Sequence, residues 1–109
     1  MIIKKPSIFI YVFKPDPSVL KDVCAGIEEE GVFYEIKEME EASPDALAWA
    51  AANDSMPGSG IGVRGRGITL KMRGLPKGRS IEAYQEPDRE QCRKLGSNSA
   101  RVIKKMPLK

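Results

Sequence analysis

The chain contains no histidine, and this absence removes several of the commonest catalytic and metal sites. Serine or cysteine nucleophiles that depend on a histidine base, the usual zinc sites and a histidine pH switch are all excluded. Carboxylate acid–base chemistry remains open in principle, but no two carboxylates are paired across a recognisable cleft. The residues by themselves therefore offer no convincing catalytic residue.

Cysteine and long apolar runs are also scarce. Only Cys24 and Cys92 are present, far apart and without metal spacing, so a disulfide framework is not expected and a reducing cytoplasm fits the chain. Both cysteines fall on expected apolar helix faces and are predicted to be small buried side chains. The apolar run 8–13 is too short for a membrane span and lacks a cleavage site, which indicates a buried strand; no membrane partner is expected.

Aromatic residues make up only 6% of the chain, and they are rare where the charge is most positive. Residues 1–54 carry 5 basic and 11 acidic side chains (−6), and residues 55–109 carry 13 basic and 4 acidic side chains (+9), which sum to +3. Such polarity is typical of nucleic-acid binding through the basic half or of docking between charged protein surfaces. The basic half contains a single aromatic residue, Tyr84, and so lacks stacking platforms for single strands. Protein partners are therefore predicted, and nucleic acid is not.

The order of apolar stretches and turn residues predicts an α/β fold. Strands are expected at residues 8–13, 32–36, 61–63, 68–72 and, at a sheet edge, 80–84. Helices are expected to begin at Asp16-Pro17, at Ser43-Pro44 and after Pro87. Trp49 is interpreted as a packing residue where the second helix meets the sheet. The pattern predicts one α/β sandwich with a mixed sheet.

The segment Gly58-Ser-Gly-Ile-Gly62 resembles a phosphate-binding loop, but its context excludes that function. A dinucleotide fingerprint follows a strand and precedes a helix, whereas here a helix precedes and a hairpin follows. The lysine of a nucleoside-triphosphate loop is also missing. We interpret these glycines as positions where backbones approach closely, at the end of an irregular segment 53–60, and expect no direct nucleotide contact.

Three consecutive carboxylates, Glu28, Glu29 and Glu30, fall on the last turn of the first helix, just before the glycine that ends it. The helix macrodipole disfavours acidic residues at that end by about 0.3–1 kcal/mol each. These side chains therefore either hold a cation or a basic partner surface, or form a solvated turn without a role.

The last expected helix contains two residues with low helix propensity, Gly96 and Asn98. A glycine in this position marks either a close contact or a break between two shorter helices. Because Arg101 and Lys104 follow, the segment offers a basic, hydrogen-bonding face to a partner or is simply a solvated basic helix.

Two of these segments together resemble a known family. Gly-Ile-Glu-Glu-Glu-Gly at 26–31 and Leu-Gly-Ser-Asn-Ser-Ala-Arg-Val-Ile-Lys at 95–104 are similar to the medium subunits of cobalamin-dependent diol and glycerol dehydratases. That family includes the small subunits of the dehydratase reactivating factors. The glycine segment 58–62, Ile-Thr-Leu at 68–70 and Gly-Leu-Pro at 74–76 fit the same pattern, so the resemblance covers about residues 7 to 108. It implies a single three-layer α/β/α domain over residues 1–109, with a mixed, mostly parallel sheet of about five strands.

The resemblance implies a non-catalytic subunit with one of two roles. In a reactivating factor, the small subunit joins a large actin-like ATPase subunit, and the complex releases damaged cobalamin from an inactivated diol or glycerol dehydratase by subunit exchange. In the dehydratase itself, the medium subunit helps to enclose the cobalamin. The chain end at Lys109, without the extensions of dehydratase medium subunits, favours the reactivating factor, although the 58–62 loop looks closer to the dehydratase form. The expected setting is cytoplasmic, with association with a bacterial microcompartment left open.

The resemblance also implies roles for particular residues. Glu29 is the expected ligand of a divalent, magnesium-like cation that acidic residues of the large subunit would share. One carboxylate cannot form such a site, so the isolated protein should bind the ion weakly. Further residues are expected in the interface with partner subunits: Glu28, Glu30, Asn98, Arg101 and Lys104. Cobalamin is expected at this chain only in the dehydratase alternative.

Overall fold

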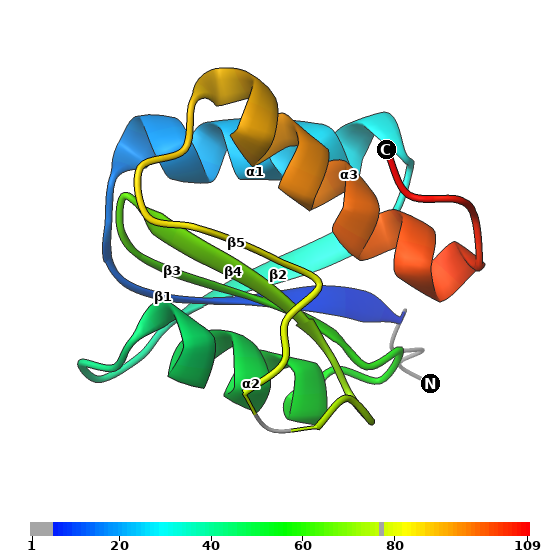
Figure 1. Ribbon diagram of the computed structural model, residues 1–109, viewed down its shortest axis with the longest axis horizontal. Coiled ribbons are helices and arrows are strands. Elements are labelled where there is room, and N and C mark those ends of the chain that lie inside the picture. Colours follow the sequence, from blue (N-terminus) through cyan, green and yellow to red (C-terminus); the bar gives the residue numbers. More distant parts are fainter. Residues whose placement is uncertain (1–5, 77) are drawn as a thin grey trace, which may run out of the picture.

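Five strands form one sheet in the order β2-β1-β3-β4-β5, and three helices cover its two faces in a computed structural model that describes residues 6–76 and 78–109 (Figure 1). The strands are β1 (Ser7–Pro15), β2 (Phe33–Glu38), β3 (Ser59–Gly65), β4 (Gly67–Met72) and β5 (Glu82–Tyr84). The helices are α1 (Pro17–Glu29), α2 (Pro44–Asp54) and α3 (Arg89–Lys104).

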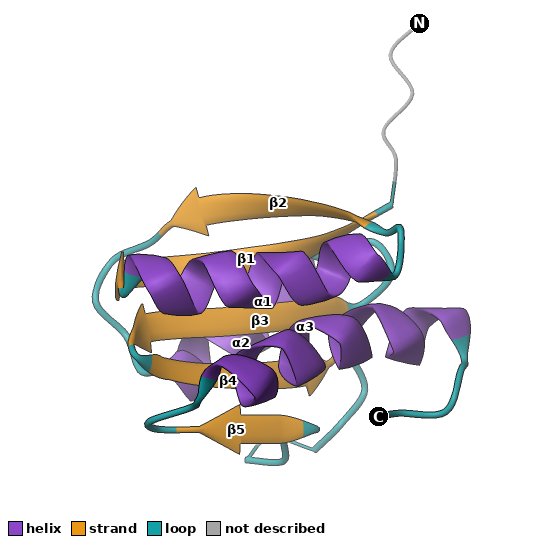
Figure 2. Ribbon diagram, turned by 90° about the horizontal axis from the view of Figure 1, so that it is seen from above, coloured by secondary structure: helices purple, strands orange, loops and turns teal. Residues whose placement is uncertain are grey.

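The sheet is mixed. β1 pairs in parallel with β2 and β3, whereas β4 and β5 continue the sheet as antiparallel strands. α1 and α3 lie side by side on one face, and α2 covers the other face (Figures 1 and 2). The predicted α/β fold with three layers and a mixed sheet around a parallel core is therefore confirmed, as is the short edge strand.

The first two helices begin at the capping residues that the sequence indicates, and the third begins just after Pro87, as predicted. Asp16 accepts hydrogen bonds from the backbone N–H groups of Ser18 and Val19, and Ser43 accepts one from Ala46. Asp88 and Gln91 form a reciprocal capping box at the start of α3. These local bonds satisfy backbone donors that have no partner within the helix, which explains why the starts can be predicted from sequence.

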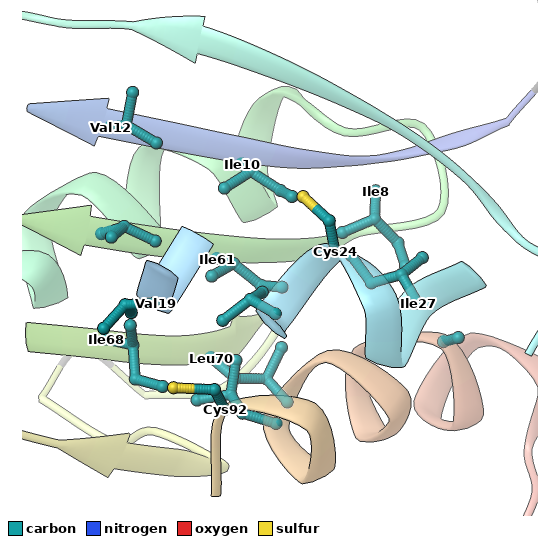
Figure 3. Close-up of a cluster of buried hydrophobic side chains, with 14 residues drawn as sticks. Ile8, Ile10, Val12, Val19, Cys24, Ile27, Ile61, Ile68, Leu70 and Cys92 are labelled. Atoms are coloured by element: carbon teal, nitrogen blue, oxygen red, sulfur yellow. The ribbon is translucent and has the colours of Figure 1, made fainter. Parts of the chain in front are cut away.

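The larger core lies between the sheet and the α1–α3 layer, and both cysteines belong to it (Figure 3). Alternate residues of β1 point into this core, and Tyr11 points to the opposite face, toward α2. Burial raises the pKa of the Cys24 thiol and raises that of Cys92 to about 11. Both thiols are therefore protonated near neutral pH, and the prediction of small buried side chains is confirmed.

The α2 helix lies in direct backbone contact with β3. A Cβ atom on Gly60 would lie 2.1 Å from the Ala52 nitrogen, and one on Gly62 would lie 2.1 Å from the Pro44 carbonyl oxygen. The interpretation of these glycines as points of close approach is confirmed. Both boundaries of the irregular segment 53–60 were wrong, because residues 53 and 54 belong to α2, and Ser59 and Gly60 already belong to β3.

The expectation for Trp49 was also wrong. The helix α2 buries Leu47, Ala48, Ala51 and Ala52 against the sheet, whereas Trp49 is 46% exposed. Small alanines allow the helix to approach β3 closely, and position 49 lies on the side of the helix turned away from that contact.

None of the helices that the structure describes could span a membrane, because none combines sufficient length with sufficient apolar character.

Candidate functional site

The carboxylates at the end of α1 form the centre of the candidate site, and we call Glu28, Glu29 and Glu30 the acidic turn. Glu30 is the C-cap of α1, and Gly31 follows it with a φ of 69°, in the left-handed region that glycine adopts readily. The last turn of α1 contains no basic residue of its own. Any compensation of these negative charges must therefore come from other elements.

A direct contact between helices brings α3 to the acidic turn. A Cβ atom on Gly26 would lie 2.1 Å from the Arg93 carbonyl oxygen, and one on Gly96 would lie 2.0 Å from the Val23 carbonyl oxygen. The helix α3 continues without a break through Gly96. Of the two interpretations of this glycine, close contact is therefore correct. Because the backbones touch at Gly26 and Gly96, polar side chains of the two helices meet at the edges of this contact.

Glu30 accepts several of the bonds made at this rim. Its Oε2 accepts hydrogen bonds from Ser97 Oγ at 2.6 Å and from Arg101 Nε at 3.2 Å. Lys104 Nζ donates to the Glu30 backbone oxygen at 2.9 Å and lies 3.8 Å from its Oε1. The Glu30 side chain is only 9% exposed. It is thus a nearly buried carboxylate that connects the end of α1 to α3.

The other two carboxylates of the acidic turn are more accessible. Glu29 forms an ion pair with Arg93, lies 3.7 Å from Lys109 Nζ, and has a side chain that is 39% exposed. Glu28 is exposed, and its nearest hydrogen-bond donor is the Tyr34 hydroxyl at 3.4 Å. The three neighbouring residues therefore differ in environment, and only Glu28 and Glu29 present carboxylate oxygens to an approaching molecule.

Two carboxylates of the acidic turn, Glu29 and Glu30, are held in their charged form. The hydrogen bond from Ser97, followed by the bond from Arg101, lowers the pKa of Glu30 in spite of opposing desolvation. The hydrogen bond from Arg93 is the main cause that lowers the pKa of Glu29. Both side chains are consequently anionic near neutral pH, and the unfavourable macrodipole at the end of α1 is offset by cations from α3 and the C-terminal segment.

Asn98 lies behind this surface rather than on it. Asn98 is 1% exposed, its amide donates to Glu82 on β5, and its Oδ1 accepts a 2.8 Å bond from the Lys109 backbone N–H. Arg101 also donates to the Pro107 carbonyl oxygen at 3.0 Å. Asn98 and Arg101 therefore fix the C-terminal segment where it folds back along α3, as Figure 2 shows.

The structure thus brings four of the predicted residues together and adds three that the sequence analysis missed. Glu29, Glu30, Arg101 and Lys104 lie in one cluster, which also includes Arg93, Ser97 and Lys109. A signal for two of the missed residues was available. Residues 93, 97 and 101 recur every four positions and therefore share one helix face. No pattern in the sequence indicated Lys109.

A pocket of about 600 Å³ opens beside Glu29 and is lined by Arg89, Glu90, Arg93, Lys94 and Lys109 in addition. In the described part of the chain, no three histidine, cysteine, aspartate or glutamate residues are grouped to hold a metal ion. Glu29 fits a divalent cation as a single oxygen donor, provided that it leaves Arg93 and that other ligands come from a second molecule. The arrangement suits binding rather than covalent chemistry.

The chain is similar to known proteins over nearly its whole length. The family model described as dehydratase medium subunit matches residues 5–109. The propanediol dehydratase-reactivating factor small subunit of Citrobacter freundii is 32% identical, over 95% of this chain and 90% of that protein. The corresponding protein of Salmonella typhimurium is 28% identical over the same shares.

Two solved structures share the fold over nearly their whole length. One is a diol dehydratase-reactivating factor complexed with ADP and Mg2+, with a TM-score of 0.90 and 26% identity over 97% of this chain and 99% of that one. The other is a glycerol dehydratase reactivase, with a TM-score of 0.89 and 25% identity over 95% of this chain and 96% of that one.

Proposed function

Because the chain belongs to the dehydratase medium subunit family, we propose that it is the small subunit of a reactivating factor for a diol or glycerol dehydratase. The observation that carries this proposal is the agreement between relatives over nearly the full chain. Both curated relatives reported above are reactivating factor small subunits, and both solved structures are reactivating proteins. These relatives do not favour the alternative role as the cobalamin-enclosing subunit of a dehydratase.

In the proposed mechanism, this chain acts by binding and has no catalytic step of its own. It joins a large actin-like ATPase subunit, which carries the nucleotide chemistry. The complex then exchanges subunits with an inactivated dehydratase, so that this chain takes the place of the medium subunit and damaged cobalamin leaves. The polar, ion-paired rim of α1 and α3 supports this role, because charged surfaces favour specific and reversible association over permanent burial.

Affinity capture of the tagged chain from its source cells, grown on propanediol or glycerol, tests the proposal. Mass spectrometry is expected to identify a large ATPase subunit, and absorbance spectra of the captured complex are expected to show no cobalamin. The same tagged chain, heat-denatured before capture, is the control for nonspecific binding. Recovery of the large and small dehydratase subunits with cobalamin would instead support the dehydratase alternative.

We further propose that Glu29 supplies one oxygen ligand to a divalent, magnesium-like cation at the junction with the large subunit. Its exposure and its position beside an open pocket support this assignment. The cation would replace Arg93 and Lys109 as the counter-charge of Glu29, and the acidic residues of the partner would complete its coordination. Cation binding and subunit assembly are then coupled, since neither protein holds the full set of ligands.

Glu29→Gln is expected to weaken assembly with the large subunit about tenfold, because an amide is a poorer cation ligand than a carboxylate. Titration by calorimetry with and without Mg2+ checks this, and Glu40→Gln, at an exposed position away from the acidic turn, is the control. The Mg2+ dependence of assembly should disappear only in the Glu29 variant. Equal assembly of this variant and the wild type, with the same Mg2+ dependence, would contradict the assignment.

The remaining members of the proposed interface divide by accessibility. Glu28 and Lys104 are exposed and would touch a partner directly. Glu30, Asn98 and Arg101 would act by holding the acidic turn and the C-terminal segment in position. Hydrogen exchange in the same complex should therefore show protection of residues 28–30 and 98–104; unchanged exchange in both segments would place the interface elsewhere.

A further inference from the structure

A second pocket, of about 310 Å³, lies on the opposite side of the sheet from the acidic turn, between α2 and the turn after β4. Its walls come from the C-terminal half of α2, from the end of β4 and from residues 73–76 and 79. Three of its lining residues are basic and none is acidic: Lys71, Arg73 and Arg79. The pocket therefore concentrates positive charge without a compensating carboxylate.

Lys71 is the most unusual of these residues. It extends from β4 on the α2 face of the sheet and is only 4% exposed. Its Nζ donates a 3.1 Å hydrogen bond to the Arg79 carbonyl oxygen, and within the described residues it forms no ion pair with a carboxylate. Lysine is almost never this deeply buried unless it is paired, because an uncompensated ammonium is costly to remove from water. Among the residues that the structure describes, Lys71 therefore has no carboxylate as a counter-charge.

Arg73 and Arg79 add to the positive charge of the pocket in different ways. Arg73 donates to the carbonyl oxygens of Ser55 and Met56 at 2.9 and 3.0 Å, so its guanidinium is fixed at the end of α2. Arg79 is exposed at the rim of the pocket. Among the other basic residues that the structure describes, seven of twelve form ion pairs with carboxylates, as Arg64 does with Glu41. Lys71 and Arg73 instead bond to backbone carbonyl groups, which carry no negative charge to neutralise them.

The rim of the pocket is apolar as well as basic. Trp49 is 46% exposed and Leu75 is 39% exposed, and both line the opening. Tryptophan and arginine are the residue types that most often dominate the energy of protein–protein contacts, especially where they surround a small pocket. A free inorganic anion would leave these apolar side chains uncovered, whereas a protein segment would cover them.

We propose that this pocket receives an aspartate or glutamate side chain of a partner protein, while an adjacent apolar residue of that partner packs on Trp49. The carboxylate would accept a charge-assisted hydrogen bond from Lys71 Nζ and would face Arg79. It would thereby supply the counter-charge that Lys71 lacks. The inference rests on the proposed function only in that the chain works as a subunit. It adds a second docking point on the face of the sheet that the acidic turn does not reach.

The chain offers a direct readout, because Trp49 is its only tryptophan. The intact protein is titrated with a blocked dipeptide, N-acetyl-phenylalanyl-glutamic acid amide, while tryptophan fluorescence is recorded. A saturable change is expected, and the matched glutamine peptide should bind about tenfold more weakly because it lacks the charge. Equal binding of the two peptides, or no saturable change, would overturn the proposal. Saturation by inorganic phosphate but not by the glutamate peptide would also overturn it and indicate a free-anion site.

Two variants separate binding from folding. Lys71→Met keeps the aliphatic stem and is expected to lose the response to the glutamate peptide without a decrease in Tm, since it removes a buried charge that has no counter-charge. Lys21→Met, on the exposed side of α1, should bind the peptide as the wild type does. If Lys71→Met does not fold, Arg79→Gln replaces it, with at least a several-fold loss of affinity expected. Unchanged binding in the folded variant would contradict the assignment.

The peptide titration needs no partner protein, so it is independent of the capture experiment. Failure to recover a large ATPase subunit would contradict the proposed function while the fluorescence result stands. Failure of the peptide to bind, with normal capture of the large subunit, would reject the pocket alone.

Discussion

Replacing Gly96 with alanine is expected to destabilise the protein by about 3 kcal/mol or more, or to prevent folding altogether. The added Cβ would lie 2.0 Å from the Val23 carbonyl oxygen and 3.3 Å from the Gly26 Cα atom. Both obstacles are backbone atoms, so no side-chain rotation can relieve the overlap. The helices α1 and α3 would have to separate, which would also open the core beneath them and pull Ser97 and Arg101 away from Glu30.

The sign of this effect makes it a strict test. In an unconstrained helix, glycine to alanine stabilises by about 1 kcal/mol because alanine has the higher helix propensity. Denaturant unfolding followed by circular dichroism would measure the difference, with Lys94→Ala on the same helix as a control that should change stability by less than about 0.5 kcal/mol. An increase in stability of the Gly96 variant would show that the two helices are not in backbone contact.

Replacing Glu30 with alanine is expected to cost about 2 kcal/mol of stability, the second-largest effect. The substitution removes the shared counter-charge of Arg101, Lys104 and Lys109 and leaves the Ser97 hydroxyl without its acceptor. The cost stays at the lower end for a broken ion pair because the cations retain partial access to water. Thermal unfolding at neutral pH measures it, and Glu28→Ala is the control at an exposed neighbour.

The lowered pKa of Glu30 also predicts how its contribution to stability changes with pH. The pKa of Glu30 is lower in the folded state than its ordinary value of about 4.3 in an unfolded chain. The stability that Glu30 contributes is therefore fully present above that unfolded value and is lost as the pH falls through the lower folded value. The difference in Tm between the wild type and Glu30→Ala should shrink below roughly pH 4. A difference that stays constant between neutral and strongly acidic pH would show that the charge of Glu30 is not what stabilises the contact.

Much of the fold could be predicted from local sequence. The capping residues Asp16 and Ser43 satisfy backbone groups only two or three positions away, so their effect does not depend on the rest of the molecule. The period of apolar residues likewise separates helices from strands before any packing is known. The two motifs at 26–31 and 95–104 identified the family because they occur in the right order along the chain.

The candidate site could be predicted only in part. The position of Glu29 and Glu30 on the last turn of α1 follows from the sequence, but their partners Arg93 and Lys109 are more than 60 residues away along the chain. Which cation meets which carboxylate depends on how closely and in what orientation α1 and α3 approach. That approach is set by Gly26 and Gly96 together, and neither glycine alone reveals it.

The sequence by itself thus determined the elements, their order, the family and the unusual negative charge at the end of α1. Only the tertiary structure decided that this charge is compensated within the chain and that Trp49 is exposed. It also decided that Lys71 is buried without a carboxylate partner among the described residues. The physical reason is the range of the interactions. Capping and periodicity act between residues a few positions apart, whereas charge compensation and burial depend on groups that meet only after the helices have packed on the sheet.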